Sequence, residues 1–280
     1  MKGFIKVMIA GAVILVVGIV ILVIALGVHG WHIDDDYDMK YYECAEQNTT
    51  LDIDFSAGTL EINYYDGEKI KIEYPENKVL TSTISESNGT LSFSTTTKRK
   101  WNVFNWFSKI PEAKIWIPQG DIMNIHLDMN AGTTKFADGE YGDFIIGMNA
   151  GTLQIGDVAC KKLAVELSAG TLSMKNMVSA EDVRLDLSAG TLNIQSLVCP
   201  SLIGNVNAGT ANISRLNTSS VDVDVSAGTV RLGMVGAKSD YNVAVKKSAG
   251  SCNVSNQSGA TDKRIKANIS AGTLSVSFEY

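Results

Sequence analysis

Apolar and polar residues alternate with a period of two over most of the chain after residue 120, and a short motif, Ser/Asn-Ala-Gly-Thr, interrupts each alternating run. Counted from the glycine of this motif, positions −7, −5, −3, +2 and +4 are mostly apolar. A period of two is typical of strands that bury one face. The pattern therefore predicts a strand, a sharp corner and a second strand in every copy.

The copies follow one another at nearly constant spacing, with intervals between glycines of 19, 19, 20, 19, 19, 22 and 22 residues. A single copy would leave its apolar edge exposed, so we expect the copies to stack as layers in chain order. The predicted fold is all-β, a parallel β-solenoid of 19–22-residue coils, and a meander of antiparallel hairpins is the alternative. An isolated early copy lies at Gly58 and a worn one at Gly89. The predicted corner glycines are Gly58, Gly132, Gly151, Gly170, Gly190, Gly209, Gly228, Gly250 and Gly272.

Each residue of the motif has a physical reason to stand at a corner. Glycine is required where φ is positive or where the backbone crowds a neighbouring layer. The alanine before it is small enough for a tight bend. The serine or asparagine two residues before the glycine can bond to backbone groups left unpaired by the bend, or to its counterpart in the next layer.

The segment 7–28 contains 22 residues without a charge, which as a helix would reach about 33 Å and cross a bilayer. Lys2 and Lys6 precede it and acidic residues follow it, so the positive-inside bias places the N-terminus in the cytoplasm. A cleaved signal peptide fits less well, because its apolar region would be shorter. The prediction is a cytoplasmic segment 1–6, a transmembrane helix 7–28, a juxtamembrane linker 29–48 and an extracytoplasmic solenoid 49–280. The expected location is the cell membrane, with a single pass.

The charge balance narrows the choice of partners. The chain carries 24 Lys and Arg against 30 Asp and Glu, a net charge of −6. This excess of negative charge disfavours nucleic acid as a partner. His29 and His32 lack further ligands at a useful spacing, so we expect neither a metal nor a cofactor.

The four cysteines are expected to be unpaired. Cys160 and Cys199 occupy the same position of the repeat two layers apart, about 9.6 Å from one another, which exceeds the reach of a disulfide. Cys252 falls at a core position, and Cys44 lies in the predicted linker.

A carbohydrate-active enzyme is a possibility to weigh, since Glu166 and Asp186 should be neighbours on the outer face, with Arg184 beside them and Asp224 further along. Two close carboxylates can share a proton or bind a cation. An exposed column of charge is more commonly the wet side of a sheet, and no nucleophile or further ligand accompanies these groups. We therefore expect no catalytic site.

The insert 97–110, within "TKRKWNVFNWFSKIPEAK", is the one basic and aromatic cluster of an otherwise acidic chain. It could lie at a lipid headgroup surface or bind another protein. It could equally be a cap that covers the open end of the solenoid. The candidate contact residues are Lys98, Arg99, Lys100, Trp101, Phe104, Trp106 and Phe107.

A strand ending in "AKIWIP", followed by "GDIMNIHLDMNAGT" and serial "SAGTL" copies, resembles the bacterial "putative adhesin" family of unknown function. That family is similar to the head domains of autotransporter adhesins, and the resemblance covers about residues 45–280. It implies a membrane-tethered β-solenoid that binds or senses at the cell surface, and it brings no catalytic residues.

Three functions follow from these observations. The first is a membrane-anchored, non-enzymatic surface module for binding or adhesion at the bacterial envelope, in contact with an envelope protein, anionic lipid or wall polymer. The alternative is an envelope-stress sensor that acts with a partner membrane protein. The carbohydrate-active enzyme is the second alternative.

Overall fold

The computed structural model describes residues 37–98 and 111–279. The described strands belong to one compact unit, Tyr37–Tyr280. No helix among the described residues has the length and apolarity needed to cross a membrane. The predicted membrane segment 7–28 and most of the insert 97–110 lie outside the described residues.

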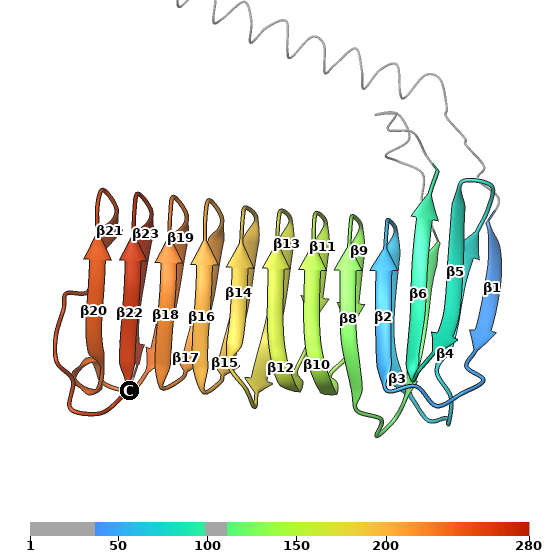
Figure 1. Cartoon of the computed structure of the whole chain (residues 1–280), viewed down its shortest axis with the longest axis horizontal. Helices are drawn as coiled ribbons and strands as arrows, with labels where there is room; N and C mark the ends of the chain where they lie inside the picture. Colours follow the sequence, from blue (N-terminus) through green and yellow to red (C-terminus); the bar gives the residue numbers. More distant parts are fainter. Residues whose placement is uncertain (1–36, 99–110, 280) are drawn as a thin grey trace, which may run out of the picture. The chain divides into compact units, whose positions relative to one another are not determined.

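The unit is a stack of coils, and each regular coil contributes one strand to each of two walls (Figure 1). The first wall is formed by the strands that precede the corners, and most of its neighbours are parallel. In spatial order these strands are β5 (Leu80–Ser87), β6 (Thr90–Thr97), β2 (Thr50–Phe55), β8 (Met123–Met129), β10 (Gly139–Met148), β12 (Val158–Leu167), β14 (Val183–Leu187), β16 (Ser201–Val206), β18 (Ser220–Val225), β22 (Arg264–Ile269) and β20 (Asn242–Lys247).

The second wall is formed by the strands that follow the corners, together with β1 and β4 at one end. Its spatial order is β1 (Asp38–Glu43), β4 (Lys71–Glu76), β7 (Glu112–Pro118), β3 (Thr59–Tyr65), β9 (Thr133–Phe136), β11 (Thr152–Ile155), β13 (Thr171–Ser179), β15 (Thr191–Val198), β17 (Thr210–Asn217), β19 (Thr229–Val235), β23 (Thr273–Glu279) and β21 (Ser251–Cys252). A short 3₁₀ helix, η2 (Lys238–Asp240), leads into β20.

Apolar side chains from both walls fill the space between them. Alternate residues of each strand are buried, as in β14 with its pattern of Val183, Leu185 and Leu187 inward. The parallel register places like positions of successive coils over one another, so that Leu163 lies beside Val183 and then Leu202. Fully burying each such side chain contributes about 1.5–3 kcal/mol. The predicted all-β, mainly parallel architecture is confirmed.

The corner glycines form a column in which each backbone packs on that of the next coil. A Cβ atom on Gly151 would lie 2.3 Å from the carbonyl oxygen of Gly132, and one on Gly209 would lie 2.8 Å from that of Gly190. The same carbonyls accept hydrogen bonds from the threonine after the next glycine, such as Thr152 N to Gly132 O at 2.9 Å. Positive φ occurs at the first five corners only: Gly58, Gly132, Gly151, Gly170 and Gly190. Close approach is therefore the requirement that the corner glycines from Gly132 to Gly272 share.

The last two coils are stacked in the opposite order to the chain, which corrects the expectation of sequential layers. β22 pairs with β18 on one side and with β20 on the other, so the coil of Gly272 lies between those of Gly228 and Gly250. The terminal position of β20 explains why Lys247 can occupy an inward column, since nothing in the stack covers that coil. The outer edge of β20 is partly closed by Gln257, whose backbone exchanges two hydrogen bonds with Val243 at 2.9 and 3.0 Å.

The early part of the chain also differs from expectation. The copy at Gly58 is not isolated, because β2 and β3 pair directly with β8 and β9. The worn copy at Gly89 is not a corner: Asn88 and Gly89 have φ of 51° and 74° and form the tight turn of the antiparallel β5–β6 hairpin. The predicted linker 29–48 contains β1, and Cys44 just after it is buried. Part of this segment therefore belongs to the folded unit.

Candidate functional site

The described ends of the basic and aromatic insert lie where a corner would be. β6 runs parallel to β2, and β7 runs parallel to β3, so β6 and β7 form the two walls of one coil. In the neighbouring coil the turn at Gly58 joins β2 to β3, whereas here residues 98–111 join β6 to β7. The worn copy at Gly89 does not mark this connection, because Gly89 lies in the turn of the β5–β6 hairpin.

The chain enters the unit at the same edge. Asp38, the first residue of β1, lies opposite Glu76, the last residue of β4. The turn that follows β4 receives Lys98, whose backbone N–H donates to the carbonyl of Val79 at 2.7 Å. Glu112 begins β7 at this edge too, since Lys114 pairs with Glu73 of β4. The segment that precedes β1 and both ends of the insert therefore leave the unit from one edge.

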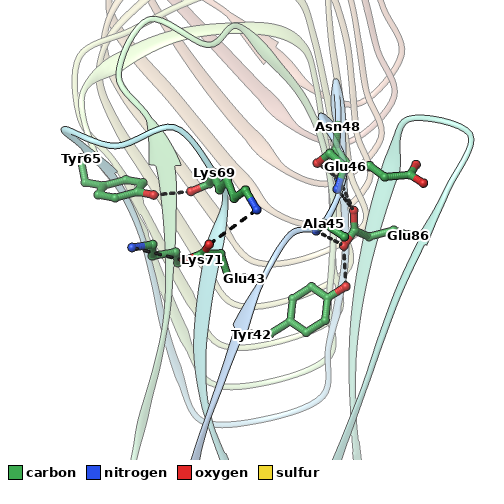
Figure 2. Close-up of polar contacts among 9 residues, drawn as sticks. All are labelled: Tyr42, Glu43, Ala45, Glu46, Asn48, Tyr65, Lys69, Lys71 and Glu86. Atoms are coloured by element: carbon green, nitrogen blue, oxygen red, sulfur yellow. Dashed lines mark hydrogen bonds and ion pairs between the residues drawn. The ribbon is translucent and has the colours of Figure 1, made fainter.

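A carboxylate fastens the polypeptide after β1 to the hairpin of β5 and β6 (Figure 2). Glu86 accepts hydrogen bonds from the Tyr42 hydroxyl at 2.5 Å, the backbone N–H of Ala45 at 2.9 Å, and the backbone N–H of Glu46 and the side chain of Asn48 at 3.0 Å each. Burial raises the pKa of this group, but the four donors outweigh that effect and lower the pKa of Glu86 to about 2. The bond to Glu86 also raises the pKa of Tyr42 to about 12. We call this arrangement the Glu86 clasp.

Beside the clasp, the outer face of β1, β4 and β7 holds a depression of about 520 Å³. Glu43, Lys71 and Trp116 lie in one row across the three strands. The ammonium of Lys71 lies 3.5 Å from the carboxylate of Glu43 and 5.3 Å from the centre of the Tyr65 ring, and Lys69 lies 3.7 Å from Glu43 (Figure 2). The full lining comprises Tyr41, Tyr42, Glu43, Tyr65, Lys71, Ile72 and Trp116. We call it the aromatic depression.

Sequence reasoning missed most of this site. It placed Tyr41 and Tyr42 in the predicted juxtamembrane linker 29–48, and it quoted Trp116 only as part of a family motif. Tyr65 and Lys71 come from the two ends of one loop and meet Trp116 only because β7 inserts between β3 and β4. An aromatic residue at an outward position of a strand, such as Trp116 between inward Ile115 and Ile117, was the available signal.

Glu166 and Asp186, two of the carboxylates considered for catalysis, are neighbours as expected, and Asp186 and Asp224 accept hydrogen bonds from side chains of the same wall. Glu166 pairs in register with Asp186. Asp186 accepts from Arg184 Nε at 2.7 Å and from the Asn205 amide, and Asp224 accepts from Asn268 at 2.6 Å. Burial raises the pKa of Asp186, and the bonds from Asn205 and Arg184 outweigh this and hold it below its ordinary value. Within 37–98 and 111–279, no group of three His, Cys, Asp or Glu residues is placed to hold a metal.

All four cysteines are free, as the repeat register predicted. Cys160 and Cys199 are buried on separate coils, and Cys252 is half-buried. Burial raises the pKa of the Cys160 and Cys199 thiols to about 11. These residues act as small apolar side chains of the core.

Comparison with known proteins bears on the identity of the fold. A solved structure from Bacteroides fragilis described as a "putative adhesin" is 16% identical, covers 87% of this chain and 98% of its own, and superposes with a TM-score of 0.50. A "putative lipid binding protein" from Parabacteroides distasonis is 12% identical, with coverages of 87% and 97% and a TM-score of 0.44. None of the curated proteins matches. The family model described as Toastrack DUF4097 matches residues 48–278. The resemblance drawn from the repeats is thus confirmed, and the chain belongs to the Toastrack DUF4097 family.

Proposed function

We propose that this chain is a non-enzymatic surface module, held in the cell membrane by residues 7–28 and displaying its solenoid outside the cell for binding or adhesion at the envelope. The convergence of three chain ends at one edge supports the proposal most directly. The segment before Asp38 and both ends of the insert, at Lys98 and Glu112, leave the unit together. Because the chain reaches both the proposed anchor and the basic, aromatic insert from this one edge, the two segments could contact the same membrane surface.

The residue types suit that arrangement. Tryptophan and phenylalanine partition into the interface between water and lipid, and lysine and arginine are attracted to anionic headgroups. The acidic first wall, with Asp52, Asp54 and Asp128 on adjacent strands, would be repelled by the same surface. The proposed orientation therefore turns the insert toward the lipid and leaves the walls accessible to other envelope components.

Accessibility of an engineered thiol tests the sidedness. Ile122 is 60% exposed, so an Ile122→Cys variant should react in intact cells with a maleimide that cannot cross the membrane, provided that the half-buried native thiol is removed by Cys252→Ser in this variant and in the control. A Lys2→Cys variant serves as the matched control and should react only after the cells are permeabilised. Labelling of position 2 but not of position 122 in intact cells would contradict the proposal.

A second experiment tests the insert as the contact. A photo-crosslinker at Trp106 in intact cells should capture lipid or a discrete envelope protein. Replacement of Trp101, Trp106 and Phe107 by serine should abolish the capture from a crosslinker placed at Phe104. The control replaces three exposed apolar residues elsewhere, Ile122, Val178 and Ile203, by serine. Equal capture by both triple variants would exclude the insert as the contact.

A further inference from the structure

The aromatic depression has features of a binding site that the proposed membrane contact does not use. Its volume of about 520 Å³ falls within the range of about 300–1,000 Å³ in which proteins bind small ligands. The side chains on its outer face are the aromatic rings of Tyr41, Tyr65 and Trp116, one carboxylate and one ammonium group. The Tyr42 side chain points to the core side of β1, where its hydroxyl donates to Glu86. Tyr41, at 75% exposure, is the most exposed of the large hydrophobic side chains in the described unit.

The charges of the depression are already paired, and this limits the ligand. Glu43 lies between Lys69 and Lys71, at 3.7 and 3.5 Å, so neither cation is available without the loss of an ion pair. A cationic ligand is disfavoured as well, because Lys71 itself lies over the face of the Tyr65 ring, at 5.3 Å from its centre. The site therefore favours an uncharged ligand.

The aromatic faces define what kind of uncharged ligand would fit. The side chains of Tyr41 and Trp116 stand on the outward faces of β1 and β7, the two strands that flank β4, and such rings carry negative charge density on their faces. A pyranose with equatorial substituents presents weakly positive C–H groups on its two faces and hydroxyl groups around its rim. The rim hydroxyls can donate to Glu43 and accept from Lys71 while the C–H face covers an aromatic ring.

We infer that the aromatic depression binds a β-1,4-linked hexopyranose chain, the chemistry of a wall glycan. The inference rests on the proposed function, because only a solenoid displayed outside the membrane would meet such a polymer. Binding without cleavage is expected. Glycosidases use two carboxyl groups about 5–9.5 Å apart, and Glu43 is the one carboxylate among the lining residues, where it is held by two lysines.

Fluorine NMR of the full chain in detergent, labelled with 5-fluorotryptophan, tests the inference directly. The chain contains four tryptophans, and the Trp116→Phe variant identifies the resonance of Trp116 by its disappearance. The probes are the β-1,4-linked tetrasaccharides of glucose and of N-acetylglucosamine. We expect the resonance of Trp116 to shift in a saturable manner with at least one of them. No shift with either probe up to about 10 mM, a concentration at which even weak specific binding is visible, would overturn the inference.

Variants separate ring stacking from a loss of structure. Tyr41→Ala removes an exposed ring outside the core, and we expect it to weaken binding about tenfold. Trp116→Phe should retain more affinity than Trp116→Ala. Ile122→Ala, which removes an exposed apolar side chain outside the depression, is the matched control and should bind as the unaltered chain does. Equal affinity of the Tyr41→Ala and Ile122→Ala variants would overturn the assignment.

The outcomes also distinguish this inference from the proposed function. If the Trp116 resonance shifts with vesicles of phosphatidylglycerol but not with saccharide, the ligand of the aromatic depression is a lipid and the inference of a glycan site is wrong. Thiol labelling at position 122 reports display outside the cell whether or not saccharide binds. Labelled cells without saccharide binding would refute the glycan site alone, and unlabelled cells would refute the surface display.

Discussion

Alanine substitutions at one turn glycine, Gly120 between β7 and β8, and at two corner glycines separate the two reasons for which the corner glycines are needed. Gly120 has a positive φ of 96°, and no atom lies within 4 Å of the place that a Cβ would occupy, so Gly120→Ala tests backbone strain alone. Gly209 lacks positive φ, but its Cβ would lie 2.8 Å from the carbonyl oxygen of Gly190, so Gly209→Ala tests close approach alone. Gly151 combines a φ of 103° with a distance of 2.3 Å to Gly132 O. Gly151→Ala therefore tests both.

The expected losses of stability follow from these distances. A side chain at such a φ costs about 1–3 kcal/mol, and the alanine recovers about 0.4–1 kcal/mol through a less flexible unfolded chain. Overpacking in a tight contact costs about 1–3 kcal/mol, to which the strained Thr152–Gly132 hydrogen bond adds about 1 kcal/mol. We expect a loss of about 1 kcal/mol for Gly120→Ala, about 2 for Gly209→Ala and about 4 for Gly151→Ala.

Urea unfolding followed by the far-ultraviolet circular dichroism of the β-structure provides the measurement. Relative midpoints under identical conditions are sufficient, because stacked coils need not unfold in one step. The order of midpoints should be Gly120→Ala above Gly209→Ala above Gly151→Ala. A Gly151→Ala variant as stable as Gly120→Ala would show that the coils can separate at the corner without cost, and the reasoning from close approach would be wrong.

Three further predictions concern other parts of the unit. The pKa of Glu86 is lowered from 4.5 to about 2, so the Glu86 clasp stabilises the fold fully above pH 4.5 and should lose that stability as the pH falls toward 2. In the Glu86→Gln variant, the thermal midpoint should lose this part of its pH dependence. An unchanged pH profile would contradict the clasp. Burial raises the pKa values of the Cys160 and Cys199 thiols to about 11, so both should resist a thiol reagent at pH 8 until the chain is unfolded, whereas half-buried Cys252 should react first. Rapid labelling of all four cysteines in the native chain would contradict this order of reactivity. Truncation after Asp262 removes β22 and β23. Because β22 is the ladder partner of β20, the truncation should also abolish the protection of the β20 amides from hydrogen exchange. Protection that persists in β20 would mean that the coils of Gly250 and Gly272 stack in chain order.

The repeat made much of the architecture predictable from the sequence. A fixed interval between corners, with period-two alternation on each side, specifies two parallel walls and the inward face of every strand, so Leu163, Leu172 and Leu192 were correctly placed in the core. It also placed Glu166 beside Asp186 and kept Cys160 apart from Cys199. These results follow from local geometry, which each coil repeats.

The order of the coils and the aromatic depression could not be obtained in the same way. Equivalent coils present nearly identical edges, so the period does not encode which coil contacts which. The lengthened intervals near Gly250 and the polar Lys247 signalled an irregularity without its direction. The aromatic depression is formed by strands that lie outside the repeat. Its residues meet through the antiparallel pairings of β1 with β4 and of β4 with β7, and these strands carry no copy of the glycine motif.

The interior position of β22 and β23 has a consequence for how the protein is made. A ribosome produces the coil of Gly250 before that of Gly272, yet β22, the strand that pairs with β20 among the described strands, must arrive between β20 and β18. The coil of Gly250 must therefore wait, with a gap in both walls, until β22 and β23 have been synthesised and delivered. A chain that stopped before β22 would lose the coil of Gly272 and leave that of Gly250 without its neighbour, so arrival of the later coil is the step that seats the earlier one.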